Sequence, residues 1–535
     1  MQKQAIAFRD TKYFSSLICD YLEGKEEVTP LYHRFPNLIN FEKQLQEKSE
    51  SYPDHHRATL VETLGSQYET LSTSDTTLRN IELLGSSTTF TITTGHQLNL
   101  FTGPLYFLYK IISTINLTEQ LKRAYPDYDF VPIYWMATED HDFEEINYFN
   151  FKGKKIQWNR TDGGAVGDLT TEGLDTVFEV LDKVFGQGVN AMALKNLFKE
   201  SYAKHQNLAD ATRYLANALF QDYGLVIVDA HTRAQKQLFV PYMEEELLKQ
   251  TAYKEVTKQT VVLKEKGYPV QVNPREINLF YLQNGSRKRI VHEDGRFMVH
   301  ETNLEWSKEA ILEHLHKMPE CFSPNVIMRP LYQEVLLPNL CYIGGGGELA
   351  YWLELKNYFE TVKVPFPILL LRNSALLLSQ KQASKIEKLQ VEIEELFLKS
   401  HELINHKVRQ ISNIPINFEQ QKKHLSQQFE ALYEMAKSTD PSFEGAVKAQ
   451  EVKQLKGLEV LEKRLLQAQK RKLSDHVMRL TAVQNELFPN KSLQERKNNF
   501  SELYLEYGPT LISTLKETLA PLCGEFDVLV LEDFD

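Results

Sequence analysis

The stretch from residue 91 to residue 145 constrains the fold most, because strand, loop, helix, strand and loop patterns follow one another within it. A β-prone run at 90–94 enters a turn at Gly95, and a second β-prone run covers 130–136. Between them, about 103–123 is apolar on more than one helical face, which is typical of a helix buried against a sheet. This order is the opening of a βαβ unit, so the sequence predicts an α/β fold built on a parallel sheet.

Polar residues follow both predicted strands. Because ligands of such sheets bind beyond the carboxyl ends of the strands, we expect the two groups to face one crevice. The first group contains Thr94, Gly95, His96, Gln97, Asn99 and Gly103. The second group contains Trp135, Glu139, Asp140, His141 and Asp142. A third apolar run, at 225–228, ends in Asp229 and His231 and is a further candidate to deliver side chains there.

Histidines and carboxylates in these groups suit proton transfer or cation binding. An imidazole titrates near neutral pH, and neighbouring carboxylates raise its proton affinity or hold Mg²⁺ through oxygen. A structural role is the alternative for each of these residues. His96 would then hydrogen-bond a helix start, and the acidic residues at 139, 140 and 142 would cap the next helix.

Four consecutive glycines form the other informative feature. Gly344, Gly345, Gly346 and Gly347 lie between a predicted strand (about 340–343) and a predicted helix that carries Glu348. Such a turn lets backbone approach an anionic ligand, although it matches neither G-x-G-x-x-G nor a Walker A motif. The alternative is a tight turn that packs helix on strand. Arg329 and Arg372 are candidate anion clamps or structural ion-pair partners, and we expect Lys110 to be solvated or structural.

The rest of the chain predicts a core with insertions. We expect a Rossmann-like core over 1–375, with inserted subdomains at about 146–220 and 260–320, the second antiparallel. Apolar residues at Ile386, Leu389, Leu396 and Leu403, and later at Leu458 and Leu461, favour an antiparallel coiled coil over 376–490. We expect 500–535 to form a helix and a strand that returns to the main sheet.

Composition excludes several classes. A net charge of -11 argues against a non-specific nucleic-acid binder, because phosphate neutralisation needs an excess of Lys and Arg. The four cysteines are scattered, so we predict neither a disulfide framework nor a zinc site. No apolar run reaches the length of a bilayer span, so we expect a cytoplasmic protein with no membrane partner.

Three motifs together resemble a known family. They are T-G-H-Q-L-N-L-F-T-G-P-L-Y, P-I-Y-W-M-A-T-E-D-H-D-F-E-E and R-P-L-Y-Q-E-V-L-L-P-N-L-C-Y-I-G-G-G-G-E-L-A-Y-W. On these residues the chain is identified as a member of the bacillithiol biosynthesis cysteine-adding family, BshC. The resemblance implies a Rossmann-type core similar to class I nucleotidyltransferases, with connecting-peptide insertions and a coiled coil that mediates homodimerisation. His96 stands where many members carry glutamine.

The resemblance also implies an activity. It implies a ligase that joins L-cysteine to the amine of glucosaminyl-malate, the last step of bacillithiol synthesis, with the carboxylate activated by ATP and Mg²⁺. His96, His141 and Asp140 would be catalytic. The remaining residues of both polar groups, with Arg329, the four glycines and Glu348, would bind substrates or nucleotide. The open alternatives are a nucleotidyltransferase-like protein acting on another small acid and a non-catalytic coiled-coil scaffold.

Overall fold

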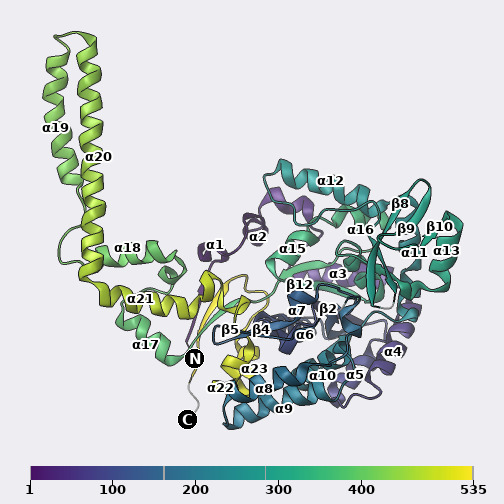
Figure 1. Cartoon of the computed structure of the whole chain (residues 1–535). Coiled ribbons are helices and arrows are strands. Elements are labelled where there is room, and N and C mark those ends of the chain that lie inside the picture. Colours follow the sequence, from purple (N-terminus) through teal and green to yellow (C-terminus); the bar gives the residue numbers. More distant parts are fainter. Residues whose placement is uncertain (1, 161–162, 284, 533–535) are drawn as a thin grey trace.

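A five-stranded parallel sheet forms the centre of the computed structural model, which describes residues 2–160, 163–283 and 285–532 (Figure 1). Its strand order is β13-β12-β2-β3-β6, and every adjacent pair is parallel. The strands are β2 (Thr89–His96), β3 (Asp129–Met136), β6 (Val226–Val228), β12 (Asn339–Gly344) and β13 (Ile368–Leu371). The predicted α/β class and its Rossmann-like parallel sheet are confirmed.

The order of addition reverses between β2 and β12. The chain lays down β2, β3 and β6 in one direction and then returns to place β12 on the other side of β2. Helix α6 (Tyr106–Ala124) connects β2 to β3, and it is buried on nearly all faces because it packs on the sheet and against α23 (Thr510–Thr518). A reversal of this kind opens a crevice at the carboxyl ends of the two strands, which is where ligands of such sheets bind.

Two insertions interrupt the core. The first contains the hairpin β4 (Tyr148–Phe151) and β5 (Lys154–Gln157), followed by α8 (Leu174–Phe185), α9 (Val189–Ala203) and α10 (Leu208–Phe220). After α11 (Arg233–Lys249) and α12 (Thr251–Glu265), the second forms an antiparallel sheet of order β10-β9-β8-β7-β11. Its strands are β7 (Leu279–Gln283), β8 (Ser286–Glu293), β9 (Arg296–Val299), β10 (Glu305–Trp306) and β11 (Phe322–Pro324).

The last strand does not return to the main sheet, so that prediction was wrong. Strand β15 (Phe526–Val530) pairs with β14 (Ala375–Leu378) and with β1 (Gln2–Ile6) in a separate three-stranded sheet. Only residues 372–374 separate β13 from β14, and Asn373 bonds to Ser113 and to the Ala520 carbonyl, which turns the chain out of the main sheet. A short apolar run indicates a strand but not its partner.

The predicted antiparallel helical arm is present but shorter than expected. Helices α19 (Glu419–Ala436) and α20 (Pro441–Lys472) pair and project away from the rest of the molecule (Figure 1). The early part of the predicted seam is wrong, because α17 (Gln380–Lys388) and α18 (Ser400–Ile411) are short helices separated by a 3₁₀ turn. Their apolar residues are buried in the main core instead; these residues are Ile386, Leu389, Leu396 and Leu403.

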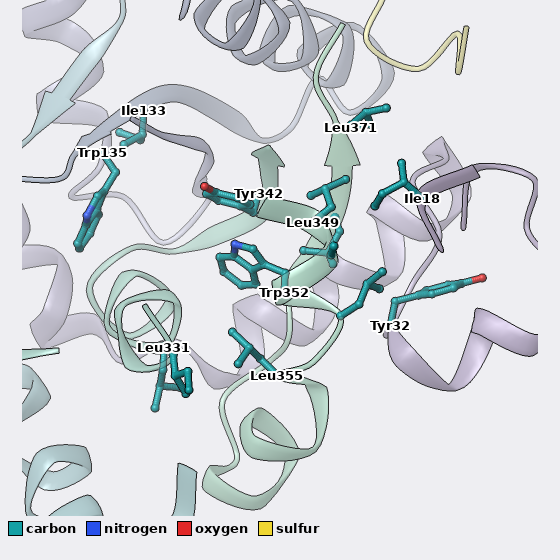
Figure 2. Close-up of a cluster of buried hydrophobic side chains, with 14 of the residues drawn as sticks. Ile18, Tyr32, Ile133, Trp135, Leu331, Tyr342, Leu349, Trp352, Leu355 and Leu371 are labelled. Atoms are coloured by element: carbon teal, nitrogen blue, oxygen red, sulfur yellow. The ribbon is translucent and has the colours of Figure 1, made fainter. Parts of the chain in front are cut away.

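A buried apolar cluster lies directly beneath the crevice. Figure 2 shows Tyr342 and Trp352 stacked, with ring centroids 4.5 Å apart, and Leu349 beside them. Trp135 packs edge-on against Tyr332 at 5.5 Å in the same cluster. Aromatic pairs of this geometry contribute about 0.5–1.5 kcal/mol beyond area burial. The cluster therefore gives the strand ends above it a rigid base.

Among the described residues, no helix combines the length and apolarity that crossing a membrane requires.

Candidate active site

A cavity of about 1000 Å³ lies at the carboxyl ends of β2, β3 and β12. The second insertion forms one of its walls. Most of the residues that the sequence singled out line it: Gly95, His96, Gln97, Trp135, Glu139, Asp140, His141, Asp142, Arg329, Gly345, Gly346, Gly347 and Glu348. The structure therefore brings the two polar groups and the glycine turn to one crevice.

Four residues named as binding candidates do not line the cavity. The Thr94 hydroxyl donates to the Ile343 carbonyl (2.8 Å), and the Gly344 carbonyl accepts from the Arg372 amide (2.9 Å). Asn99 donates to the Glu145 carbonyl at 3.3 Å. Gly103 has φ +65° and lies against Asn99 so closely that a Cβ would come within 2.6 Å of it. These contacts give all four a structural role in joining strand ends and shaping the turn.

The two polar groups are joined directly by Gln97. Its side-chain amide donates to Oδ2 of Asp140 at 2.8 Å and to Oε2 of Glu145 at 3.0 Å. The other Asp140 oxygen accepts the His141 backbone N–H at 2.7 Å. Asp140 is therefore held from both sides, with its charge at the cavity.

Asp140, His141 and Asp142 form a group whose ligand atoms lie within 4.8 Å of one another. Carboxylate oxygens suit Mg²⁺ or a substrate ammonium group. The Nδ1 atom of His141 lies 2.9 Å from Nη1 of Arg287, a guanidinium that also donates to the Pro324 carbonyl. Because a guanidinium only donates, His141 accepts through Nδ1 and is neutral in this arrangement. The carboxylates remain the ligands that fit a cation.

Glu139 is neutralised by a partner that the sequence did not reveal. Lys236 on α11 is buried, and its ammonium lies 2.7 Å from Oε1 of Glu139 while donating to the Phe322 carbonyl at 2.8 Å. The pair ties the end of β3 to α11 and β11. Glu139 therefore offers a substrate amino group less free charge than Asp140 or Asp142 does.

His96 is buried between the rings of Tyr106 and Phe107, whose centroids lie 5.6 and 5.0 Å from its own. Burial, reinforced by the nearby Lys110 charge, lowers the pKa of His96 to about 3. Its Nε2 atom has no hydrogen-bond partner among the described residues. A general base works best with a pKa near the working pH, so this geometry makes His96 a neutral hydrogen-bonding group.

The two candidate arginine clamps differ in their partners. Arg372 is buried and pairs with Glu495 at 2.7 Å, which makes it a structural ion pair, although its Nε atom has no partner within the described residues. Arg329 instead donates to Gln333 at 3.1 Å and to the Tyr351 hydroxyl at 3.5 Å. Among the ion pairs of the described residues, none joins Arg329 to a carboxylate. Arg329 is therefore the better clamp for an anion.

Of the two roles that the sequence left open for Lys110, the structure shows the structural one and not the solvated one. It is buried, and its ammonium lies 2.6 Å from both the Gly95 carbonyl and Oε2 of Glu348. One signal pointed to it: Lys110 is the single charged residue in 100–118, and a charge in so apolar a helix needs a buried partner. Other basic residues line the cavity, and no sequence motif indicated them; these are Arg275, Arg287, Arg289 and Arg496.

At the third strand end, Asp229 and His231 do not line the cavity, although Ala230 between them does. Asp229 accepts from the Thr138 hydroxyl at 2.6 Å and lies 2.9 Å from Nδ1 of His231. This carboxylate raises the pKa of His231 to about 9. The contacts join the ends of β3 and β6, which is a structural role.

Comparison with known proteins finds matches along nearly the whole chain. A family model described as "Bacillithiol biosynthesis BshC, N-terminal Rossmann-like domain" matches residues 1–373, and one described as "Bacillithiol biosynthesis BshC, C-terminal coiled-coil domain" matches 375–531. A protein of Christiangramia forsetii is 57% identical over 99% of both chains. One of Flavobacterium johnsoniae is 57% identical over 99% of this chain and 100% of its own, and one of Flavobacterium psychrophilum is 54% identical over 99% of both. Each is named "Putative cysteine ligase BshC".

Proposed function

The chain belongs to the BshC family of bacillithiol biosynthesis proteins, and on that premise we propose that it is a cysteine ligase. The observation that carries the proposal is that relatives bearing the cysteine ligase name match 99% of its length at 54% to 57% identity. The proposed reaction forms an amide between the carboxylate of L-cysteine and the amine of glucosaminyl-malate. That step completes bacillithiol.

The charge pattern of the cavity supports such substrates. Arg329 lies beside Gly95 and Tyr351, while Asp140 and Asp142 follow the end of β3. Cysteine and glucosaminyl-malate each carry both carboxylate and amino groups. A guanidinium recognises carboxylate or phosphate, and a carboxylate recognises an ammonium group or Mg²⁺. The cavity therefore offers complementary groups for both ends of each substrate.

ATP and Mg²⁺ are part of the proposal. Bound ATP would supply the activation that a free carboxylate needs before an amine can attack it. Arg329, without a carboxylate partner among the described residues, fits a phosphate group, and the oxygens of Asp140 and Asp142 fit the metal ion. The proposed role of His141 is to take the proton that the attacking amine loses. Nδ1 carries the lone pair of the neutral ring, so it would accept this proton after giving up its hydrogen bond from Arg287.

Two further properties belong to the proposal. The arm of α19 and α20 would hold two copies together as a homodimer, and the reaction would take place in the cytoplasm. An apolar groove on the arm, lined by Leu425, Leu458, Val460 and Leu461 among others, supports the first.

Thiol profiling of a strain that lacks this chain tests the proposed function. We expect bacillithiol to disappear and glucosaminyl-malate to accumulate, and the intact chain to restore the thiol. The variant Asp140→Ala should not restore it at equal protein level. Persistence of bacillithiol without accumulation of glucosaminyl-malate contradicts the proposal and favours a scaffold or an enzyme for another acid.

A further inference from the structure

Lys110 and Glu348 connect β2 and β12, the two strands that flank the crevice. They do so just beyond the point where backbone pairing between these strands ends. The pairing of β2 with β12 ends at Thr94 and Ile343, whereas β2 continues beside β3 as far as His96. Beyond that last pair, Lys110 holds the Gly95 carbonyl at 2.6 Å and Glu348 at 2.6 Å. The ion pair therefore connects the two strand ends where no hydrogen bonds of the sheet connect them.

Glu348 extends the bridge to the glycine turn. Its Oε2 atom accepts the Gly345 backbone N–H at 2.8 Å, and its Oε1 atom accepts the Tyr342 hydroxyl at 2.8 Å. Both carboxylate oxygens are thus used within the protein. The four contacts join β2, α6, β12 and the start of α15 (Gly346–Trp352) into one unit.

Close packing leaves this arrangement little freedom. A Cβ at Gly95 would lie 3.2 Å from the Tyr342 hydroxyl, so glycine is what lets that hydroxyl stand above the strand end. The ring of Tyr342 is stacked on Trp352 in the cluster beneath (Figure 2). A shift of Glu348 would therefore move either the glycine turn or this aromatic base.

We propose that Lys110 and Glu348 act as a positioning pair that sets the width of the crevice between β2 and β12, and that neither is a ligand of the substrates. This inference rests on the proposed ligase function for its kinetic readout. It also replaces the sequence expectation that Glu348 binds substrate. The Glu348 charge is matched by Lys110, so the amino group of a substrate gains little from it.

Kinetics of two single variants and their combination separate positioning from ligand binding. We expect Lys110→Met and Glu348→Gln each to lower kcat about 100-fold, because a misplacement of about 1 Å costs that much, with each KM changed less than about 3-fold. The combined variant should be at least about 10-fold more active than the worse single one, because it leaves no unpaired buried charge. The proposal is overturned if the losses of kcat in the two single variants multiply in the combined variant. It is also overturned if a variant raises the KM for one substrate about 10-fold at unchanged kcat.

A matched control excludes a general loss of folding. Lys48 is also a buried lysine paired with a buried glutamate, Glu334 at 3.3 Å, and neither residue lines the cavity. If the Lys48→Met variant is soluble, its kcat should stay within about 3-fold of that of the parent chain. If the buried-charge variants prove insoluble, Tyr342→Phe removes the hydroxyl that donates to Glu348 and leaves the Lys110–Glu348 ion pair in place. It should lower kcat about 10-fold at constant KM, and an unchanged kcat overturns the proposal.

Two readouts do not depend on the reaction. Lys110 lies close enough to lower the pKa of His96, so Lys110→Met should raise that pKa when the ring is followed by NMR. Hydrogen exchange at the Gly345 amide should quicken in Glu348→Gln. If neither changes, the positioning pair is wrong even in an active enzyme. If both change but the parent chain forms no product from cysteine and glucosaminyl-malate, the proposed function fails and the pair stands.

Discussion

The side-chain amide of Gln97 donates a hydrogen bond to Oδ2 of Asp140 at 2.8 Å, which joins two sequence motifs 43 residues apart at one rim of the sheet. Because Gln97 follows β2 and Asp140 follows β3, this bond ties two neighbouring strand ends together. It holds the Asp140 carboxylate in place, as the His141 amide does from the other side. The site is therefore pre-organised around this carboxylate.

Removing that carboxylate should abolish turnover without unfolding the protein. We expect Asp140→Ala and His141→Ala each to reduce kcat/KM by about 100-fold or more. The first removes a proposed ligand of Mg²⁺, and the second removes the proposed proton acceptor, whose loss costs about this much. Glu144→Ala, four residues beyond Asp140 and three beyond His141 and outside the cavity lining, is the control and should stay active. Steady-state kinetics and circular dichroism check both points. Full activity in the first two variants would return the cluster to a capping role.

The two arginines should respond differently to the same substitution. Arg329→Gln should raise the KM of an anionic substrate about 10- to 100-fold, since a charge-assisted hydrogen bond contributes about 1.5–3 kcal/mol. Arg372→Gln should instead destabilise the fold by about 3–5 kcal/mol, because Glu495 would stay buried without its partner. Kinetics and urea denaturation of both variants separate the roles, and the reverse pattern would contradict them.

Glu354 should make stability depend on pH. It is fully buried, it accepts the Gln271 N–H through Oε1 at 2.6 Å, and its Oε2 has no partner among the described residues. Burial raises the pKa of Glu354 to about 7. A carboxyl pKa raised above its unfolded value of 4.5 favours the folded state below about pH 4.5, and this contribution is lost as the pH rises through 7.

The variant Glu354→Gln isolates this contribution, because its amide keeps an acceptor for Gln271 but does not ionise. From pH 5 to pH 8 the free energy of unfolding of the parent chain should fall by about 1–3 kcal/mol relative to the variant. Urea denaturation at several pH values measures the difference. A difference that stays constant across this range would show that Glu354 is already ionised at pH 5.

The arm should be the dimer contact. Val460 and Leu461 on α20 are half-exposed and line an apolar groove with Leu425 of α19, so a second copy is expected to cover them. We expect light scattering to give a dimer at micromolar concentration and Leu461→Glu to give a monomer with unchanged helix content. A monomeric parent chain would remove this prediction.

Local patterns predicted the core of the fold well. The 90–94 and 130–136 runs and the strand before Gly344 each marked a parallel strand, because buried strands and their polar ends leave a clear signal in sequence. Their shared crevice followed from the rule for strand carboxyl ends. The likeness to class I nucleotidyltransferases stays a prediction.

Partner choice was not predictable to the same degree. Nothing near Phe526 indicates that its strand pairs with β14 rather than with the main sheet, and the heptad-like spacing of Ile386 and Leu389 arises from packing against the core. The partners of Glu139 and Arg372 come from residues about 100 or more positions away, Lys236 and Glu495. Such pairs depend on tertiary contacts that periodicity and spacing do not record.

Ligation at this cavity is tested by mass spectrometry of the product that the purified chain forms from L-cysteine, glucosaminyl-malate and MgATP. We predict a new species with the mass of the two substrates joined by loss of one water, formed by the parent chain and lost in Asp140→Ala. Absence of that species with folded parent protein, or its equal formation by Asp140→Ala, would contradict ligation at this cavity.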